Sequence, residues 1–254
     1  MSHTYEMVVG RQFGPRAKAY VESGVHAAGH DLDALETLVE QAGPAHALDL
    51  GTGGGHVTYR LARHAGAVTA CDLSAEMLGA VATTAAARGL SNVTTVETSA
   101  EHLPFDDGTF DFVACRFSAH HWRDFHAGLR QARRVAKPRA PAVFIDAYVP
   151  GMALLDTHVQ AIELLRDTSH GRDYSLAEWT AALGQAGFTV RNLNTWRLRM
   201  DFPVWTARMA TPELNQQAIR ALQAAASTEV REHFAIEPDG SFMLDIMMVE
   251  TVAA

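Results

Sequence analysis

An acid and a run of glycines close the short apolar segment that begins at Ala47 in ALDLGTGGG. Gly51, Gly53 and Gly55 would let the backbone pass close to a flat ligand, because glycine has no side chain to obstruct the approach. Asp49 places a negative charge beside that ligand, which would repel a pyrophosphate and attract a cation. The stretch therefore predicts a site for a flat ligand that carries positive charge.

Two phosphate-binding patterns with a similar opening do not fit. The dinucleotide fingerprint needs a small third residue where His56 stands, and the G-K-[ST] ending of a P-loop is absent. A second acid, Asp72, closes the next apolar segment 23 residues after Asp49. A carboxylate can accept from two hydroxyls at once, which favours a ribose diol as its partner.

A pair of histidines, His120 and His121, lies in the stretch RFSAHHWRDF. Imidazole titrates near neutrality, so either histidine could act as a general base or bind a substrate. The alternative is that one histidine caps the next helix and that Trp122 is a core residue. No metal site with His126 is expected, because no cysteine or carboxylate nearby completes a ligand set.

The segments that must position these residues alternate between strand and helix patterns. Strands are expected at 46–50, 67–73, 92–97, 110–117 and 140–149, and helices at 31–43, 56–65, 75–89 and 125–136. Such alternation predicts a parallel sheet with helices on both faces, and ligands bind at the carboxyl ends of its strands. A helical piece and loop (150–174), a capped helix (175–188) and two closing strands (189–200 and 241–252) are expected to follow.

Four stretches in this order, DLGTGGG, ACDLSAEML, AEHLPFDDGTFDFV and RVAKPRAPAVF, resemble the class I S-adenosylmethionine-dependent methyltransferases. The most similar group is the small-molecule enzymes like the ubiquinone/menaquinone C-methyltransferases. The resemblance covers roughly residues 45–150. It implies an α/β, doubly wound Rossmann-like fold with a seven-stranded, mostly parallel sheet and a reversed last strand, and S-adenosyl-L-methionine as cofactor.

The resemblance implies roles for the acids and glycines. Asp49 and the turn at Gly51 and Gly53 would face the methionine moiety of the cofactor. Asp72 would hold the ribose hydroxyls, and Leu73 would pack by the adenine.

Further roles follow from the third and fourth strands. Ser99, Ala100 and Glu101 would lie at the adenine edge, and Arg116 would lie by the sulfonium and the substrate. The family often has Asp where Ser99 stands. Serine can accept a hydrogen bond from the adenine amino group, but without a negative charge.

We expect one methyltransferase domain over residues 1–254. It would comprise an N-terminal helical cap (1–44), a cofactor-binding half (45–150) and a substrate-side half (151–254). Phe13 and Tyr20 are expected either to form a lid that shields the sulfonium or to belong to a helix docked on the sheet edge. Met152, Trp196, Trp205 and Met209 are expected in the core more than in a pocket, by ordinary burial.

The composition constrains the partners. The formal net charge is −8, and RQARR is the densest basic run, which disfavours nucleic acid as a partner. No apolar run is long enough for a membrane span, and the first 20 residues lack the apolar core of a signal peptide, so a cytoplasmic location is expected. Cys71 and Cys115 are expected to be buried thiols.

The expected function is methyl transfer to a small, partly apolar organic acceptor, with carbon or oxygen favoured over nitrogen as the methylated atom. The NPPY motif of nucleic-acid base-methylating members is absent. With a histidine base, the rate should fall below about pH 6.5. Should neither histidine act, Asp156, His158 and Tyr174 are the next candidates.

Two other functions stay open on the sequence alone. One is a cofactor-binding module that has lost its chemistry and serves regulation or assembly. The other is a nicotinamide-dependent oxidoreductase. Two features count against it: His56, and the about 46 residues that lie before the first strand.

Overall fold

The computed structural model describes residues 4–16 and 29–254. Its strands are β1 (His46–Leu50), β2 (Ala67–Asp72), β3 (Val93–Glu97), β4 (Phe112–Arg116), β5 (Pro141–Val149), β6 (Tyr174–Ser175), β7 (Phe188–Met200) and β8 (Phe242–Ala253). Its helices are α1 (Tyr5–Phe13), α4 (His30–Ala42), α5 (His56–Leu61), α6 (Ala75–Ala87), α7 (Phe125–Val135), α8 (Ala153–Arg166), α9 (Leu176–Ala186), α10 (Phe202–Arg208), α11 (Glu213–Ala225) and α12 (Thr228–His233), with 3₁₀ turns η1 (Gly14–Arg16) and η2 (Ala119–His121).

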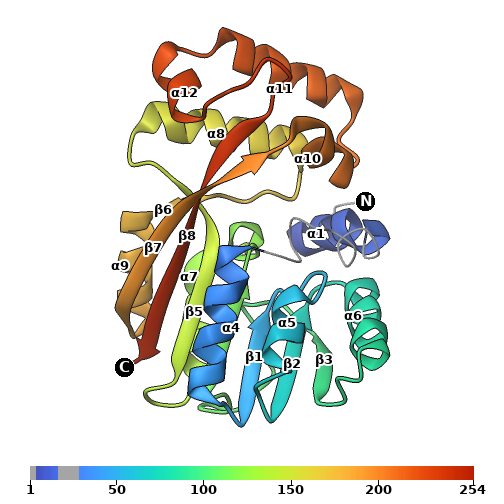
Figure 1. Ribbon diagram of the computed structural model, residues 1–254, viewed down its shortest axis with the longest axis vertical. Coiled ribbons are helices and arrows are strands. Elements are labelled where there is room, and N and C mark those ends of the chain that lie inside the picture. The colour runs from blue at the N-terminus through green and yellow to red at the C-terminus, as the bar shows by residue number, and fades with distance from the viewer. Residues whose placement is uncertain (1–3, 17–28) are drawn as a thin grey trace.

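Seven strands form the main sheet in the order β3-β2-β1-β4-β5-β8-β7 (Figure 1). Strands β1 to β5 pair in parallel, while β8 runs antiparallel to both β5 and β7. The predicted α/β sheet with a reversed last strand is therefore confirmed. The short strand β6, which pairs with β5 off this path, was not predicted.

Alternate strand residues face two apolar layers, as a parallel sheet buried on both faces requires. Ala47 faces the layer that contains α4 and α5, whereas Leu48 faces the layer that contains α7 and α9. The predicted thiols, Cys71 and Cys115, are both buried.

Helix ends follow the local chemistry of the sequence. The Ser74 hydroxyl accepts from the Met77 backbone N–H at 3.2 Å and begins α6. Ser175 and Glu178 form a reciprocal capping box at the start of α9, which ends at Gly187 in the left-handed conformation.

The helices α8, α10, α11 and α12 form a cap at the top of Figure 1, into which β7 and β8 extend. Helix α1 lies beside this cap, above the helical layers of the sheet. The space between the cap, α1 and the carboxyl ends of β1 and β4 holds the candidate site. Among the described residues, no helix is long and apolar enough to cross a membrane.

Candidate functional site

The glycine turn between β1 and α5 lies close to the segment that follows β4. Gly51 has φ of +68°, and a Cβ there would lie 1.8 Å from the Ser118 Oγ. Gly53, with φ of +49°, donates its backbone N–H to the Asp72 Oδ2 at 2.9 Å. A larger residue at Gly51 would therefore both clash and strain the backbone.

This turn borders a cavity of about 120 Å³ at the carboxyl ends of β1, β2 and β4. Helix α1 contributes Tyr5, Glu6, Val9 and Phe13 to its wall. Most of the residues expected to bind the cofactor line it, namely Asp49, Gly51, Gly53, Asp72, Leu73, Ala100, Glu101 and Arg116. The structure thus brings residues from three of the four family-like stretches, together with Arg116 from the stretch RFSAHHWRDF, to one cavity.

Ser99 differs from the other expected cofactor residues. Its side chain is buried, its Oγ lies 3.3 Å from the His102 Nδ1, and it is not among the residues that line the cavity. The neighbouring Thr98 lines the cavity instead. The role expected for Ser99 at the adenine edge remains a prediction.

The Asp49 carboxylate is only 1% exposed, although the cavity reaches it. Thr58 donates its hydroxyl to the Asp49 Oδ2 at 2.6 Å. Burial raises the pKa of Asp49 to about 6, and the Thr58 hydrogen bond opposes this rise. A buried carboxylate whose charge costs this much favours a cationic ligand.

Asp72 serves the local fold as well as the cavity. Its Oδ2 accepts from Gly53 and its Oδ1 accepts from the Ser74 backbone N–H at 3.0 Å, which holds the glycine turn against the start of α6. Each carboxylate oxygen has a second lone pair, so the group can also accept from a ligand. Burial raises the pKa of Asp72.

Arg116 forms an ion pair with Asp31 from the first turn of α4. Both side chains are almost fully buried, and the guanidinium lies over the Phe117 ring. Arg116 lines the cavity, and its expected position by the sulfonium remains a prediction. Sequence reasoning missed Asp31, because an acid in the first turn of a helix is ordinary.

Of the two residues expected to form a lid, one borders the cavity. Phe13 lines the cavity, and its ring makes an edge contact with His121 at a centroid distance of 4.9 Å. Tyr20 lies outside the described residues. Tyr5, which the sequence did not single out, donates its hydroxyl to the Ser169 carbonyl at 2.6 Å.

A second cavity of about 80 Å³ adjoins the first and shares Phe13, Phe117 and His121 with it. Its polar lining includes His120, Glu163, Arg166, Asp173 and Arg208, and its apolar lining includes Ala147, Leu198, Met200, Trp205 and Leu244. The cap and strands β7 and β8 contribute most of these residues, so this cavity lies on the side of the chain that follows β5.

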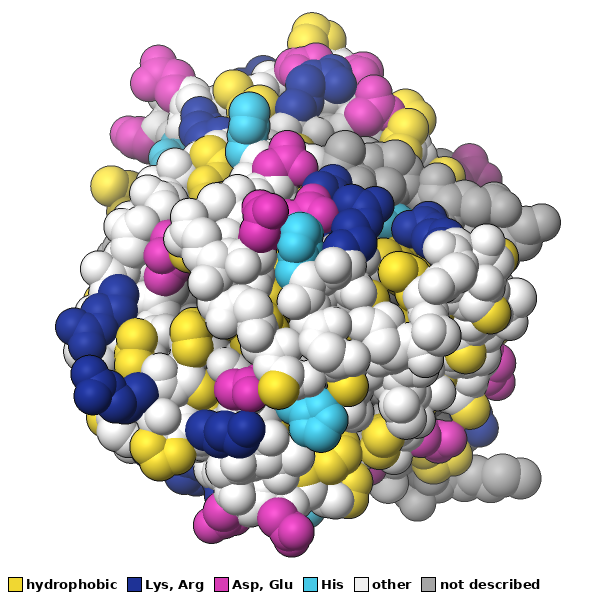
Figure 2. Space-filling view, turned by 60° about the horizontal axis from the view of Figure 1, so that its bottom comes forward, with side chains coloured by type: hydrophobic (Ala, Val, Ile, Leu, Met, Phe, Trp, Pro, Cys, Tyr) yellow, Lys and Arg dark blue, Asp and Glu magenta, His cyan; other side chains and the backbone are white. Residues whose placement is uncertain are grey.

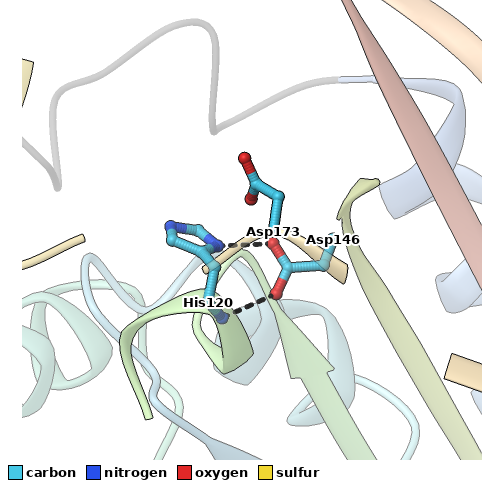
Figure 3. Close-up of side chains that lie close together, drawn as sticks. All are labelled: His120, Asp146 and Asp173. Atoms are coloured by element: carbon cyan, nitrogen blue, oxygen red, sulfur yellow. Dashed lines mark hydrogen bonds and ion pairs between the residues drawn. The ribbon is translucent and has the colours of Figure 1, made fainter. Parts of the chain in front are cut away.

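His120 is fixed by a carboxylate from strand β5 (Figure 3). Its Nδ1 lies 2.6 Å from the Asp146 Oδ1, and its backbone N–H donates to the Asp146 Oδ2 at 3.3 Å. Burial lowers the pKa of His120, but the charge and hydrogen bond of Asp146 outweigh burial and raise it above the ordinary value. His120 is therefore held as a cation at neutral pH.

His121 is held in the opposite state. Its Nδ1 lies 2.9 Å from the Ser169 carbonyl, which can only accept, so Nδ1 carries the proton and Nε2 has a free lone pair. Burial and the positive charge of His120 lower the pKa of His121. This neutral imidazole lines both cavities.

The alternative role for the histidines, as a helix cap, is wrong. Asp124 caps α7 by accepting from the Ala127 backbone N–H at 2.8 Å. Trp122 is buried, as that alternative required. The premise that no carboxylate lies near the histidines is also wrong, because Asp146 approaches from β5.

The sequence did carry a signal for Asp146, a single acid within the apolar strand VFIDAYV. Asp173 had no such signal, because it lies in a loop rich in polar residues before β6. Both acids reach His120 only through the tertiary fold.

The next candidates for a general base, Asp156, His158 and Tyr174, line neither cavity. Asp156 pairs with Arg172 at 2.9 Å, and Tyr174 stacks on Phe125 at a centroid distance of 4.0 Å. His158 packs near Phe234, and burial lowers its pKa.

The methionine and tryptophan residues that were expected in the core after residue 150 have different positions. Met209 is buried and Trp196 packs against the core, as expected. Trp205 is buried and also lines the second cavity, whereas Met152 is 54% exposed.

Charged side chains of both signs are spread over the face of the molecule in Figure 2, with uncharged surface between them. Among the described residues of this face, no continuous basic surface of the kind that tracks a nucleic-acid backbone is visible.

Comparison with known proteins identifies a methyltransferase domain in this chain. Residues 48–144 match the family described as "Methyltransferase domain". The chain is 47% identical to the uncharacterized protein YafE of Escherichia coli over 196 residues, which cover 77% of this chain and 95% of YafE. It is 31% identical to the uncharacterized methyltransferase YcgJ of Bacillus subtilis over 224 residues, 88% of each protein.

The crystal structure of YcgJ superimposes with a TM-score of 0.84 at 29% identity, covering 88% of this chain and 97% of YcgJ. A more distant relative is a demethylmenaquinone methyltransferase of Chlorobaculum tepidum, 35% identical over 109 residues, 42% of this chain and 43% of that protein.

Proposed function

The chain belongs to the class I S-adenosylmethionine-dependent methyltransferases, and from that premise we propose that it methylates a small, partly apolar organic acceptor at carbon or oxygen. The observation that carries the proposal is the position of His121. A neutral imidazole with a free Nε2 borders both the cofactor-side cavity and the adjoining mixed cavity.

The residues of the larger cavity fit the cofactor of this family. S-adenosylmethionine supplies a methyl group bound to a positively charged sulfur. Asp49 offers a buried carboxylate to a cationic ligand, and Asp72 keeps lone pairs for ribose hydroxyls. The Ser118 side chain occupies the space that a Cβ at Gly51 would need, so this position in the wall requires glycine.

The smaller cavity fits the acceptor. Trp205, Leu198 and Leu244 offer apolar contact, while Arg166 and Glu163 offer polar groups at one wall. Such a mixture suits a molecule with an apolar body and a few polar substituents. Arg166 is held by its N–H donation to the Trp205 carbonyl at 3.1 Å and by Glu163, whose carboxylate oxygen lies 3.5 Å from the Arg166 Nη1.

His121 is assigned as the general base for the acceptor. The Ser169 carbonyl fixes the tautomer, so Nε2 takes the proton that an oxygen or an acidic carbon releases. The charge of His120 disfavours a second proton on His121 and keeps the base in its active form near neutrality. Phe13, in edge contact with His121, covers the junction of the two cavities.

The test is transfer of a labelled methyl group from S-adenosylmethionine to a panel of phenols, quinone precursors and other apolar acceptors. We expect at least one acceptor to be methylated at carbon or oxygen, and His121→Gln to lose this activity while it still binds S-adenosylhomocysteine. Binding of the cofactor with no transfer to any acceptor or cell-extract fraction would favour an inactive module. Saturable binding of NADH in place of S-adenosylhomocysteine would favour an oxidoreductase.

A further inference from the structure

Three side chains from separate elements converge beside the smaller cavity, and two of them, His120 and Asp173, line it (Figure 3). His120 comes from η2, Asp146 from β5, and Asp173 from the loop before β6. One ligand atom of each lies within 4.8 Å of the other two. Asp146 and Asp173 are 1% and 2% exposed, so the group is shielded from bulk water.

The donor atoms of this group are already oriented. Asp146 accepts backbone N–H groups from Ala147 at 2.9 Å and from His120 at 3.3 Å, which fixes its carboxylate against the strand. The His120 Nδ1 lies 2.6 Å from the Asp146 Oδ1. Ligand atoms that bind one ion at about 2.1 Å lie about 3 Å apart, so a small opening of this contact would admit an ion in place of the shared proton.

A second observation, on the Asp173 side chain, also points to a bound cation. Its Oδ2 is buried and has no hydrogen-bond partner among the described residues, and its side chain lines the smaller cavity. An unpartnered carboxylate oxygen in such a place costs free energy that a bound cation would offset. Glu163, also buried, faces the same cavity and adds negative charge.

We propose that His120, Asp146 and Asp173 bind a divalent transition-metal ion, of which Mn²⁺ and Zn²⁺ are the expected species. One imidazole and two carboxylates form a mixed nitrogen and oxygen set that suits these ions better than Ca²⁺. The remaining coordination positions face the smaller cavity. If the proposed function holds, an oxygen of the acceptor binds there, and the ion replaces the His120 proton as the positive charge beside His121.

The test uses the full chain without an affinity tag, treated with a chelator and then titrated with Mn²⁺ while free Mn²⁺ is measured by electron paramagnetic resonance. We expect one bound ion per chain, a higher thermal midpoint with Mn²⁺, and tighter binding as pH rises, because the ion competes with a proton for the imidazole. Asp173→Asn should weaken binding at least about tenfold. Asp167→Asn is the matched control, since Asp167 is equally buried with an unpartnered Oδ2 but lies outside the group.

A second measurement keeps the test valid should Asp173→Asn fold poorly. Pulsed resonance of Mn²⁺ bound to the wild type should show coupling to an imidazole nitrogen that His120→Gln removes. The proposal is overturned if 1 mM Mn²⁺ and Zn²⁺ do not bind, or if Asp173→Asn and Asp167→Asn weaken binding equally. None of these measurements requires methyl transfer, so failure of the metal site and failure of the proposed function are distinguishable.

Discussion

The rings of His120 and His121 lie 4.1 Å apart, and their pKa values are shifted in opposite directions. Both imidazoles are half-buried, and loss of solvation alone would lower both pKa values. The Asp146 carboxylate raises the pKa of His120 and so outweighs the loss of solvation at that ring only. The resulting positive charge on His120 lowers the pKa of His121 further. Neighbouring residues of one type are thereby given two different protonation states.

The first prediction concerns the pH profile of methyl transfer. An ordinary imidazole base would lose activity below about pH 6.5. A base with a lowered pKa is protonated only at lower pH, so the acid limb of kcat for the wild type should have its midpoint below that value. His121→Gln should lower kcat by about 10²- to 10⁴-fold with cofactor affinity nearly unchanged.

His120→Gln distinguishes the two histidines. Loss of the neighbouring positive charge raises the pKa of His121, so the acid limb of the remaining turnover should move to higher pH. An unchanged limb in His120→Gln, or near-full turnover in His121→Gln, would mean that these assignments are wrong.

The second prediction concerns Asp49 and cofactor affinity. Asp49 carries its charge only above about pH 6, so the affinity for S-adenosylhomocysteine, whose amino group is cationic, should fall as pH drops from 7 to 5. Asp49→Asn should bind about 10- to 100-fold more weakly at pH 7, the effect of one charge-assisted hydrogen bond. Calorimetry of both proteins across this range is the measurement. A pH dependence that persists in Asp49→Asn would place the titrating group elsewhere.

The third prediction concerns Asp72. Asp72→Ala should weaken S-adenosylhomocysteine binding by about 30- to 1,000-fold, because two charge-assisted hydrogen bonds to the ribose are lost. The thermal midpoint should also fall, since Gly53 and Ser74 lose their shared acceptor. Glu97→Ala, at the exposed end of the neighbouring strand β3, is the control. A change of less than threefold in Asp72→Ala would exclude Asp72 as the ribose ligand.

The fourth prediction concerns Gly51. Gly51→Ala places a Cβ 1.8 Å from the Ser118 Oγ at a positive φ, which costs about 1–2 kcal/mol in backbone strain before the clash is counted. We expect a lower thermal midpoint and, because the turn must shift to relieve the strain and the clash, a loss of about 5- to 30-fold in S-adenosylhomocysteine affinity. Gly79→Ala, in α6 with no atom within 4 Å of an added Cβ, should leave binding intact. Equal binding by both variants would remove the steric argument for the glycine turn.

The local pattern of the sequence determined the sheet and most of the cofactor side. Acids and glycines at strand ends, such as Asp49, Gly51 and Asp72, are found at the carboxyl edge because parallel strands all end there. The spacing of these residues relative to the strands places them at this edge, and contacts with distant residues are not needed to predict it. Even so, the sequence did not reveal that Asp72 also holds the turn at Gly53.

The tertiary structure alone decided how the two histidines differ. The sequence placed His120 and His121 side by side and offered no reason to treat them differently. Their protonation states depend on Asp146 and Ser169, which lie 26 and 48 residues further along the chain. Protonation follows from burial and from charges within a few ångströms, and these distances exist only once β5, the cap and η2 have packed together.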